Sequence, residues 1–405
     1  MSTLSLEKNK QRWVTLGAYL VVLHALLAYG LPPGIFLLLT VLFGVLYYRV
    51  DALESATMSL SVVIVTLLYG AVLKVTGLEN MIYYRPDEML STFDYTHKHP
   101  IYAKNAVVEM TMPHGDLQPM TNEGIAEPRN VVYKIDSYGF RNDADYRGQR
   151  CVLVGDSFVV GSGNTQADIL SSQLARDYGI DVYNLAHHGS LEDYAAYVSG
   201  FREAYGGDFE ALLFVFEGND FRSYREEKHS AFWLFAKRYY KIFSDTNVYR
   251  VTWSLVRRAI RLSAVTASRY IATAEIGGRK VAFHTGYIDV TKRVNKIRLE
   301  DFEQAIQSMR ANLAHVFFIP TSYRVYHRYI HPGEVLPNVQ WDYLNEVCVK
   351  NGLQCTNLTE PLIKASDELL KKGILTWWAD DTHWNRHGVA VAARVVAGVL
   401  RQENE

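Results

Sequence analysis

The stretch that decides the fold is Cys151-Val-Leu-Val-Gly-Asp-Ser-Phe158, in which a short apolar run leads directly into a polar turn. Four apolar residues in a row are typical of a parallel strand that is buried on both faces. Ser157 then falls at the carboxyl end of this strand and at the start of the next helix, where α/β sheets place their ligands. Taken alone, the Gly-Asp-Ser tripeptide is equally compatible with a simple tight turn.

After Ser157, further short apolar runs alternate along the chain with stretches that show helical periodicity. This alternation predicts βαβ units and hence an α/β fold, with a doubly wound parallel sheet between two helical layers. The predicted strands cover residues 181–185, 211–217, 315–320 and 353–357, and the predicted helices cover 166–177, 191–205, 299–312, 339–351 and 386–401.

The apolar residues of the 405-residue chain are concentrated in residues 1–80. Three runs there, 13–31, 33–48 and 57–76, contain almost no charges and predict a transmembrane anchor. Buried core helices of a soluble protein are the alternative, but the runs lack the polar side that an amphipathic helix shows. The formal net charge of −1 gives no indication of a nucleic-acid partner.

Basic residues flank these runs asymmetrically. Lys8, Lys10 and Arg12 precede the first run, and Arg49 follows the second, whereas the loop between them has no basic residue. The positive-inside rule places these basic segments in the cytoplasm, so three crossings would put the remaining chain outside it. If the second run does not span, two crossings would leave the remaining chain inside; the charge asymmetry favours three.

The remaining chain divides into an irregular lead-in with short strands, residues 81–148, and the α/β domain, residues 149–405. Residues 224–300 are rich in aromatic and basic residues and predict a helical insertion. Helices that pack on the domain are favoured there over a lid or a membrane-surface element. Cys348 and Cys355 would pair in an oxidising compartment and would otherwise be free thiols.

A second polar motif, Asp380-Asp-Thr-His383, stands just before the last predicted helix. A serine hydroxyl needs a base, and that base works best when a carboxylate fixes its tautomer. We therefore expect His383 to face Ser157 and Asp380 to hold the imidazole, with Asp381 as the competing carboxylate. A helix N-cap cluster is the alternative explanation of this motif.

Two more polar motifs, Asn184-Leu-Ala-His-His-Gly189 and Glu217-Gly-Asn219-Asp, follow predicted strands. A glycine N–H and an asparagine amide at these places can donate to a tetrahedral oxyanion. Each motif alone is compatible with an ordinary loop, and the two histidines either line a pocket or lie on the surface. All four motifs, however, fall at strand ends of one sheet in chain order.

On these residues the chain resembles the SGNH hydrolases, also called GDSL esterases and lipases. The resemblance covers about residues 150–225 and 310–400. It implies Ser157 as nucleophile, His383 as base and Asp380 as its orienting carboxylate. It further implies an oxyanion hole built from the N–H groups of Ser157 and Gly189 and the side chain of Asn219. Glu217 departs from the family pattern, which has a glycine there.

The segments Ser-Tyr-Gly-Phe-Arg-Asn142 and Asp-Thr-His-Trp-Asn385 are similar to those of membrane-linked bacterial members associated with O-acetylation of envelope polysaccharide. This resemblance implies an inner-membrane protein whose domain faces the periplasm and acts on acyl esters, with acetyl favoured, as an esterase or O-acyltransferase. It also implies an acylated carbohydrate substrate and, by analogy, a membrane-embedded acyl-donating partner.

Two alternatives to this activity remain open: a lipase that acts on membrane lipid, and a non-catalytic scaffold that retains the same shell. No cofactor and no metal site are expected, since His97, His99 and His114 are too loosely spaced to be ligands.

Overall fold

The computed structural model describes residues 85–94, 99–121, 123–221 and 270–402, together with the single positions 68, 72 and 75. From residue 85 onward these residues fall in one compact unit, Tyr84–Arg225 with Thr266–Glu405. The three predicted membrane runs therefore lie outside the described residues, apart from those three positions. Among the residues described, no helix is both long and apolar enough to cross a bilayer.

A five-stranded sheet forms the centre of the domain, and every pair of neighbouring strands in it is parallel. The strand order is β11-β10-β7-β5-β6, so the chain runs outward from β5 in both directions. This confirms the predicted α/β fold with a parallel sheet. The strands are β5 (Cys151–Val154), β6 (Val182–Asn184), β7 (Glu210–Phe216), β10 (Leu313–Ile319) and β11 (Gln354–Asn357).

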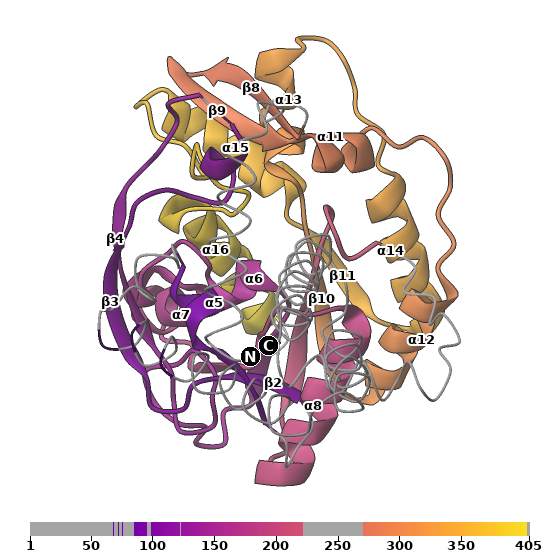
Figure 1. Cartoon of the computed structure of the whole chain (residues 1–405). Helices are drawn as coiled ribbons and strands as arrows, with labels where there is room; N and C mark the ends of the chain where they lie inside the picture. Colours follow the sequence, from indigo (N-terminus) through magenta and orange to yellow (C-terminus); the bar gives the residue numbers. More distant parts are fainter. Residues whose placement is uncertain are drawn as a thin grey trace, which may run out of the picture. The chain divides into compact units, whose positions relative to one another are not determined.

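Helices cover both faces of the sheet because its strands are apolar on both sides. In β7, Leu212 and Phe214 join one buried cluster while Leu213 and Val215 join the other. The first cluster includes residues of α7 (Leu170–Tyr178), α13 (Ser322–Ile330), α15 (Thr359–Leu370) and α16 (Arg386–Gln402). The second includes residues of α8 (Leu191–Tyr205), α12 (Glu300–Met309) and α14 (Val339–Asn351), and Figure 1 shows α12 and α14 across the sheet from α7 and α16.

The predicted strands all occur, with ends shifted by one or two residues, and α8 and α14 coincide with their predicted bounds. The helix predicted over 166–177 is divided into η2 (Gln166–Asp168) and α7, because Ile169 between them has an extended backbone. Helices α13 and α15 were not predicted.

The lead-in consists of short elements, as predicted, and several of them belong to the core. Met112, Val131 and Tyr133 are buried in the first cluster. The segment is therefore an integral layer of the domain, and it extends along the left side of Figure 1. Its elements are α5 (Pro86–Leu90), β1 (Ser91–Asp94), β2 (His99–Tyr102), β3 (Val107–Met112), η1 (Gln118–Met120) and β4 (Arg129–Lys134).

The prediction of a helical insertion over 224–300 is wrong for the part that the structure describes. Residues from 270 onward form a hairpin of β8 (Ile271–Ile276) and β9 (Arg279–His284), followed by α11 (Thr285–Thr291). Gly277 and Gly278 turn the hairpin with φ of 58° and 78°, the left-handed backbone that a tight hairpin turn requires. This Gly-Gly pair between alternating strands was the overlooked signal. Residues 224–269 lie outside the described ranges.

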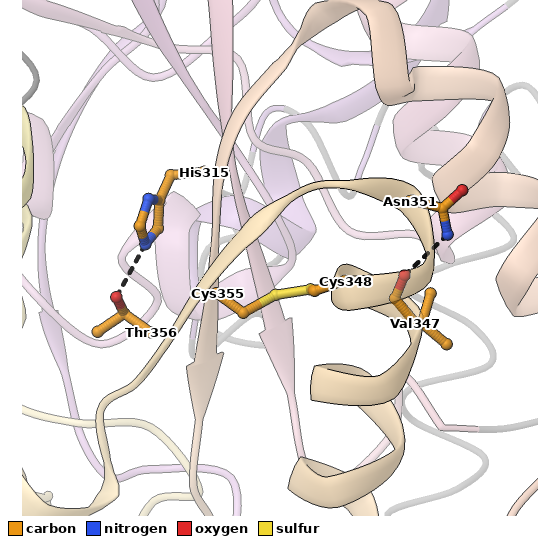
Figure 2. The surroundings of a disulfide bond; sticks show 6 residues. All are labelled: His315, Val347, Cys348, Asn351, Cys355 and Thr356. Atoms are coloured by element: carbon orange, nitrogen blue, oxygen red, sulfur yellow. Dashed lines mark hydrogen bonds between the residues drawn. A yellow bond between two sulfur atoms is a disulfide. The ribbon is translucent and has the colours of Figure 1, made fainter.

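A disulfide joins Cys348 near the end of α14 to Cys355 in β11, with a Cα–Cα distance of 6.3 Å. Figure 2 shows the bond beside the sheet, across the turn that links the helix to the strand. Gly352 ends α14 in the left-handed conformation and so reverses the chain between the two cysteines. Of the two states expected for these cysteines, the structure has the paired one.

Candidate active site

Ser157 is the first residue of α6 (Ser157–Val160), directly after β5 and its following turn. The Asp156 side chain caps this short helix by accepting a hydrogen bond from the Phe158 N–H at 2.9 Å. Gly155 permits the sharp turn, since a Cβ there would lie 2.7 Å from a methyl group of Val159. Ser157 itself is half-buried, so the turn presents its hydroxyl at the carboxyl edge of the sheet.

His383 connects this hydroxyl to a carboxylate. The Ser157 Oγ–H can donate to His383 Nε2 over 2.6 Å, and the Nδ1–H can donate to Asp381 Oδ1 over 2.6 Å. The imidazole is buried and packs against the Phe158 ring, with 4.9 Å between ring centroids. Trp384 fixes the next position by donating from Nε1 to the Phe158 carbonyl at 3.2 Å. A hydroxyl, an imidazole and a carboxylate thus form one continuous chain of hydrogen bonds, the geometry that activates a serine for nucleophilic attack.

The prediction that Asp380 orients the base requires correction, because Asp381 occupies that position. The Asp380 carboxylate instead accepts hydrogen bonds from the N–H groups of Gly115 at 2.6 Å and Glu127 at 2.8 Å. Arg129 Nη1 donates to its other oxygen at 3.0 Å. These donors all come from the lead-in, and they hold the Asp380 carboxylate away from His383.

Two buried arginines, also from the lead-in, fix the charge of Asp381. Arg85 Nη2 lies 3.1 Å from Asp381 Oδ1, and Arg129 Nη2 lies 2.8 Å from Oδ2. Burial alone would raise the pKa of Asp381, but Arg85, His383 and Arg129 hold that pKa well below its usual value. Asp381 is therefore ionised and can stabilise a positive charge that forms on His383.

Asp116 completes this network through Thr382, the residue between Asp381 and His383. It accepts hydrogen bonds from the N–H of Thr382 at 2.8 Å and from its hydroxyl at 2.5 Å. Arg85 Nη2 also lies 3.0 Å from Asp116, so one guanidinium joins two carboxylates. Burial and the neighbouring Asp381 charge both raise the pKa of Asp116. Residues of the lead-in, far from His383 in the sequence, thus hold the motif around it in place.

The ligand atoms of Asp116, Asp381 and His383 lie within 4.8 Å of one another, close enough to surround a metal ion. The two guanidinium groups on Asp381 argue against that use, since they already neutralise it and would repel a cation. The same contacts suit a carboxylate that serves an imidazole base.

Gly189 and Asn219 follow the two strands that flank β5. Because β6 and β7 both pair with β5 in parallel, their carboxyl ends lie beside Ser157 at one edge of the sheet. This is also the point where the chain changes direction across the sheet, which is where such folds bind ligands. The Asn219 amide lies close enough to Asp156 to lower its pKa, although burial raises that pKa overall.

Glu217, the departure noted in the sequence, anchors the turn that carries Asn219. Its fully buried carboxylate accepts from Arg324 Nε at 2.9 Å and from the Thr321 N–H at 3.0 Å. Asp220 on the other side of the turn accepts from the Phe216 N–H at 2.7 Å. The turn is therefore fixed on both sides without the glycine that the resemblance leads one to expect.

The two histidines before Gly189 occupy different environments. His187 is buried and stacks on Tyr102 at 4.5 Å, and burial lowers its pKa to about 3. His188 keeps 39% of its side chain exposed and places Nε2 2.9 Å from the buried Asp87. Burial opposes its charge, but the hydrogen bond to Asp87 raises the pKa of His188 above its ordinary value. Only His188 thus retains the accessible surface that a pocket-lining role requires.

Searches for known relatives do not extend this picture: no family model matches the chain, and no curated protein matches it. The chemistry follows from the site alone. A half-buried hydroxyl, a base and an ionised carboxylate in line are the parts needed for nucleophilic attack on a carbonyl carbon.

Proposed function

We propose that this protein is a serine esterase or O-acyltransferase of the SGNH type, with Ser157 as nucleophile. The observation that carries the proposal is the pair of 2.6 Å contacts that join Ser157 Oγ to His383 Nε2 and His383 Nδ1 to Asp381 Oδ1. A non-catalytic scaffold would not need a buried imidazole held between a hydroxyl and an ionised carboxylate.

In the proposed reaction, Ser157 Oγ attacks the ester carbonyl while His383 Nε2 accepts its proton. Asp381 stabilises the resulting imidazolium through Nδ1–H, and the N–H groups of Ser157 and Gly189 with the Asn219 amide donate to the oxyanion. The imidazolium then returns its proton to the leaving alkoxide, which leaves an acyl-enzyme. Water or a sugar hydroxyl, deprotonated by His383, attacks the acyl-enzyme and restores Ser157. These two acceptors distinguish hydrolysis from transfer.

The proposed substrate is an acyl ester, with acetyl favoured, of an envelope carbohydrate, and it rests on the resemblance of the motifs. The proposed location of the α/β domain is the extracytoplasmic side of the bacterial inner membrane, to which residues 1–80 would anchor it. The Cys348–Cys355 disulfide supports that side, because stable disulfides are typical of oxidising compartments. By analogy with the members that the motifs resemble, the proposal also includes a membrane-embedded partner that donates the acyl group.

The first test is labelling of the full-length protein, in detergent, with a fluorophosphonate that reacts with activated serines. We expect wild type to label, and Ser157→Ala and His383→Ala to lose labelling while they remain folded. Ser199→Ala is the matched control, because this exposed helical serine donates to the Ala195 carbonyl and belongs to none of the four motifs. Absence of labelling in folded wild type, or labelling that persists in Ser157→Ala, would refute the proposal and favour the scaffold.

Labelled and active protein would then be tested with acetyl esters in the presence and absence of oligosaccharide acceptors. Acetate release alone indicates an esterase, whereas acetylated oligosaccharide indicates a transferase. Preference for long-chain lipid esters over both would instead indicate a lipase.

A further inference from the structure

A second group of side chains with metal-binding character lies at the end of α13, outside the catalytic network. His327 belongs to the last turn of this helix, His331 follows it immediately, and Glu334 comes three residues later. The i, i+4 spacing places two histidines on one helix face, and the chain then turns so that the glutamate approaches both. The mechanism above makes no use of these residues.

The distances within this group are close to those of a coordination site. Glu334 Oε2 lies 3.8 Å from His327 Nε2 and 3.9 Å from His331 Nδ1. The centroids of the two imidazole rings are 5.2 Å apart, and one ligand atom from each of the three residues lies within 4.8 Å of the other two. Ligands of a tetrahedral Zn²⁺ ion are roughly 3.3 Å apart, given bonds of about 2.0–2.1 Å. Small side-chain rotations would therefore suffice to close the site.

A second, independent observation comes from His327 alone. Its side chain is only 4% exposed, yet Nε2, which faces Glu334, has no hydrogen-bond partner among the described residues. A buried polar atom without a partner is costly, and a bound ion or water is one way to satisfy it.

We propose that His327, His331 and Glu334 bind one divalent transition-metal ion of the Zn²⁺ type. Two imidazoles with one carboxylate suit such ions, whereas Mg²⁺ and Ca²⁺ prefer oxygen ligands throughout. The side chains of His331 and Glu334 are 43% and 52% exposed, so an ion can enter from solvent and retain a water ligand. This proposal does not depend on the proposed esterase activity.

Such an ion would join the segment between α13 and α14, which contains Glu334, to the last turn of α13. Further along that segment, the Pro337 carbonyl and the Asn338 side chain accept hydrogen bonds from Arg324, at 2.8 and 3.0 Å. Arg324 in turn pairs with the buried Glu217. The ion is therefore expected to stabilise the fold near this anchored segment, as structural metal ions do, and to leave the chemistry at Ser157 unchanged.

The test is titration of the chelator-treated, full-length protein with Zn²⁺ by calorimetry, and with Co²⁺ by visible absorption. We expect one ion per chain and a rise in Tm of about 5 °C at roughly one hundred times Kd. His331→Ala and Glu334→Gln should each weaken binding at least about tenfold. Both residues are exposed, so these variants should fold and should retain fluorophosphonate labelling.

His387→Ala is the control, since this histidine lies outside the group and should leave Zn²⁺ affinity unchanged. Three results would overturn the proposal. One is the absence of saturable Zn²⁺ binding in wild type. The second is equal affinity in wild type and both variants, and the third is loss of binding in His383→Ala with retention in His331→Ala, which would place the ion in the catalytic network.

Discussion

Exchanging the two adjacent aspartates for asparagine, one at a time, tests the orientation of the base most directly. Asp381 Oδ1 accepts hydrogen bonds from Nδ1 of His383 at 2.6 Å and from its backbone N–H at 3.1 Å, whereas the described contacts of Asp380 include none to that residue. In Asp381→Asn, an amide group next to Nδ1 would favour the imidazole tautomer with the proton on Nε2. That tautomer cannot accept a proton from Ser157.

The expected loss is large for Asp381→Asn and small for Asp380→Asn. Removal of the carboxylate from a comparable triad lowers turnover about 10⁴-fold, so we expect kcat/KM to fall by ~10³–10⁴. This corresponds to about 4–5.5 kcal/mol of transition-state stabilisation. Asp380→Asn keeps an oxygen for the N–H groups of Gly115 and Glu127 but loses the charge and the acceptor that face Arg129. It leaves the contact between Asp381 and His383 in place, so kcat/KM should fall less than about tenfold.

The assay is hydrolysis of a chromogenic acetyl ester, with circular dichroism and thermal unfolding to establish that each variant is folded. Both substitutions remove one carboxylate charge from a buried ion pair, a change that typically costs roughly 3–5 kcal/mol of stability. Asp380→Asn therefore serves as the matched control for stability, since the two variants differ in their contact with His383. Equal losses of kcat/KM in two folded variants, or a larger loss in Asp380→Asn, would refute this assignment of the carboxylate.

Three further predictions concern the surroundings of the triad and the fold. Asn219→Ala should lower kcat by ~10²–10³ with a smaller change in KM, measured by steady-state kinetics, if its amide donates to the oxyanion; an unchanged kcat would exclude it. Asp87→Asn should destabilise the protein most at acidic to neutral pH. Asp87 raises the pKa of His188, so the pair stabilises the folded protein while His188 is protonated. This contribution is complete below the pKa of about 6.5 that His188 has in the unfolded chain, and it is lost as pH rises through the higher pKa of the folded state. Urea unfolding at several pH values should show the difference from wild type shrinking above neutrality, and a growing difference would contradict this sign. Replacing Cys348 and Cys355 by serine should lower the free energy of unfolding by about 2–3 kcal/mol, because their bond closes a short loop. Urea denaturation of wild type with and without a reductant should show the same loss, and identical midpoints in the two conditions would contradict this prediction.

The sequence alone was sufficient to predict the five strands of the central sheet, their parallel arrangement and the contact between Ser157 and His383. Buried parallel strands such as Cys151–Val154 are short apolar runs, and their period and bounding turns are local properties of the chain. The motifs that follow them carry the nucleophile and the base, so their order along the chain already places them at one edge of the sheet. The hairpin at residues 271–284 was also a local pattern, and it was missed because the aromatic and basic residues before it favoured helices.

The choice of carboxylate depended on tertiary structure. Asp380 and Asp381 are chemically identical neighbours, and both are close enough to His383 along the chain to reach it. What separates them is the lead-in, which brings Arg85, Asp116 and Arg129 more than 250 residues along the chain to the motif. Its backbone N–H groups hold one carboxylate, and its guanidinium groups fix the charge of the other. Such contacts depend on how distant segments pack, and no local spacing in the sequence encodes them.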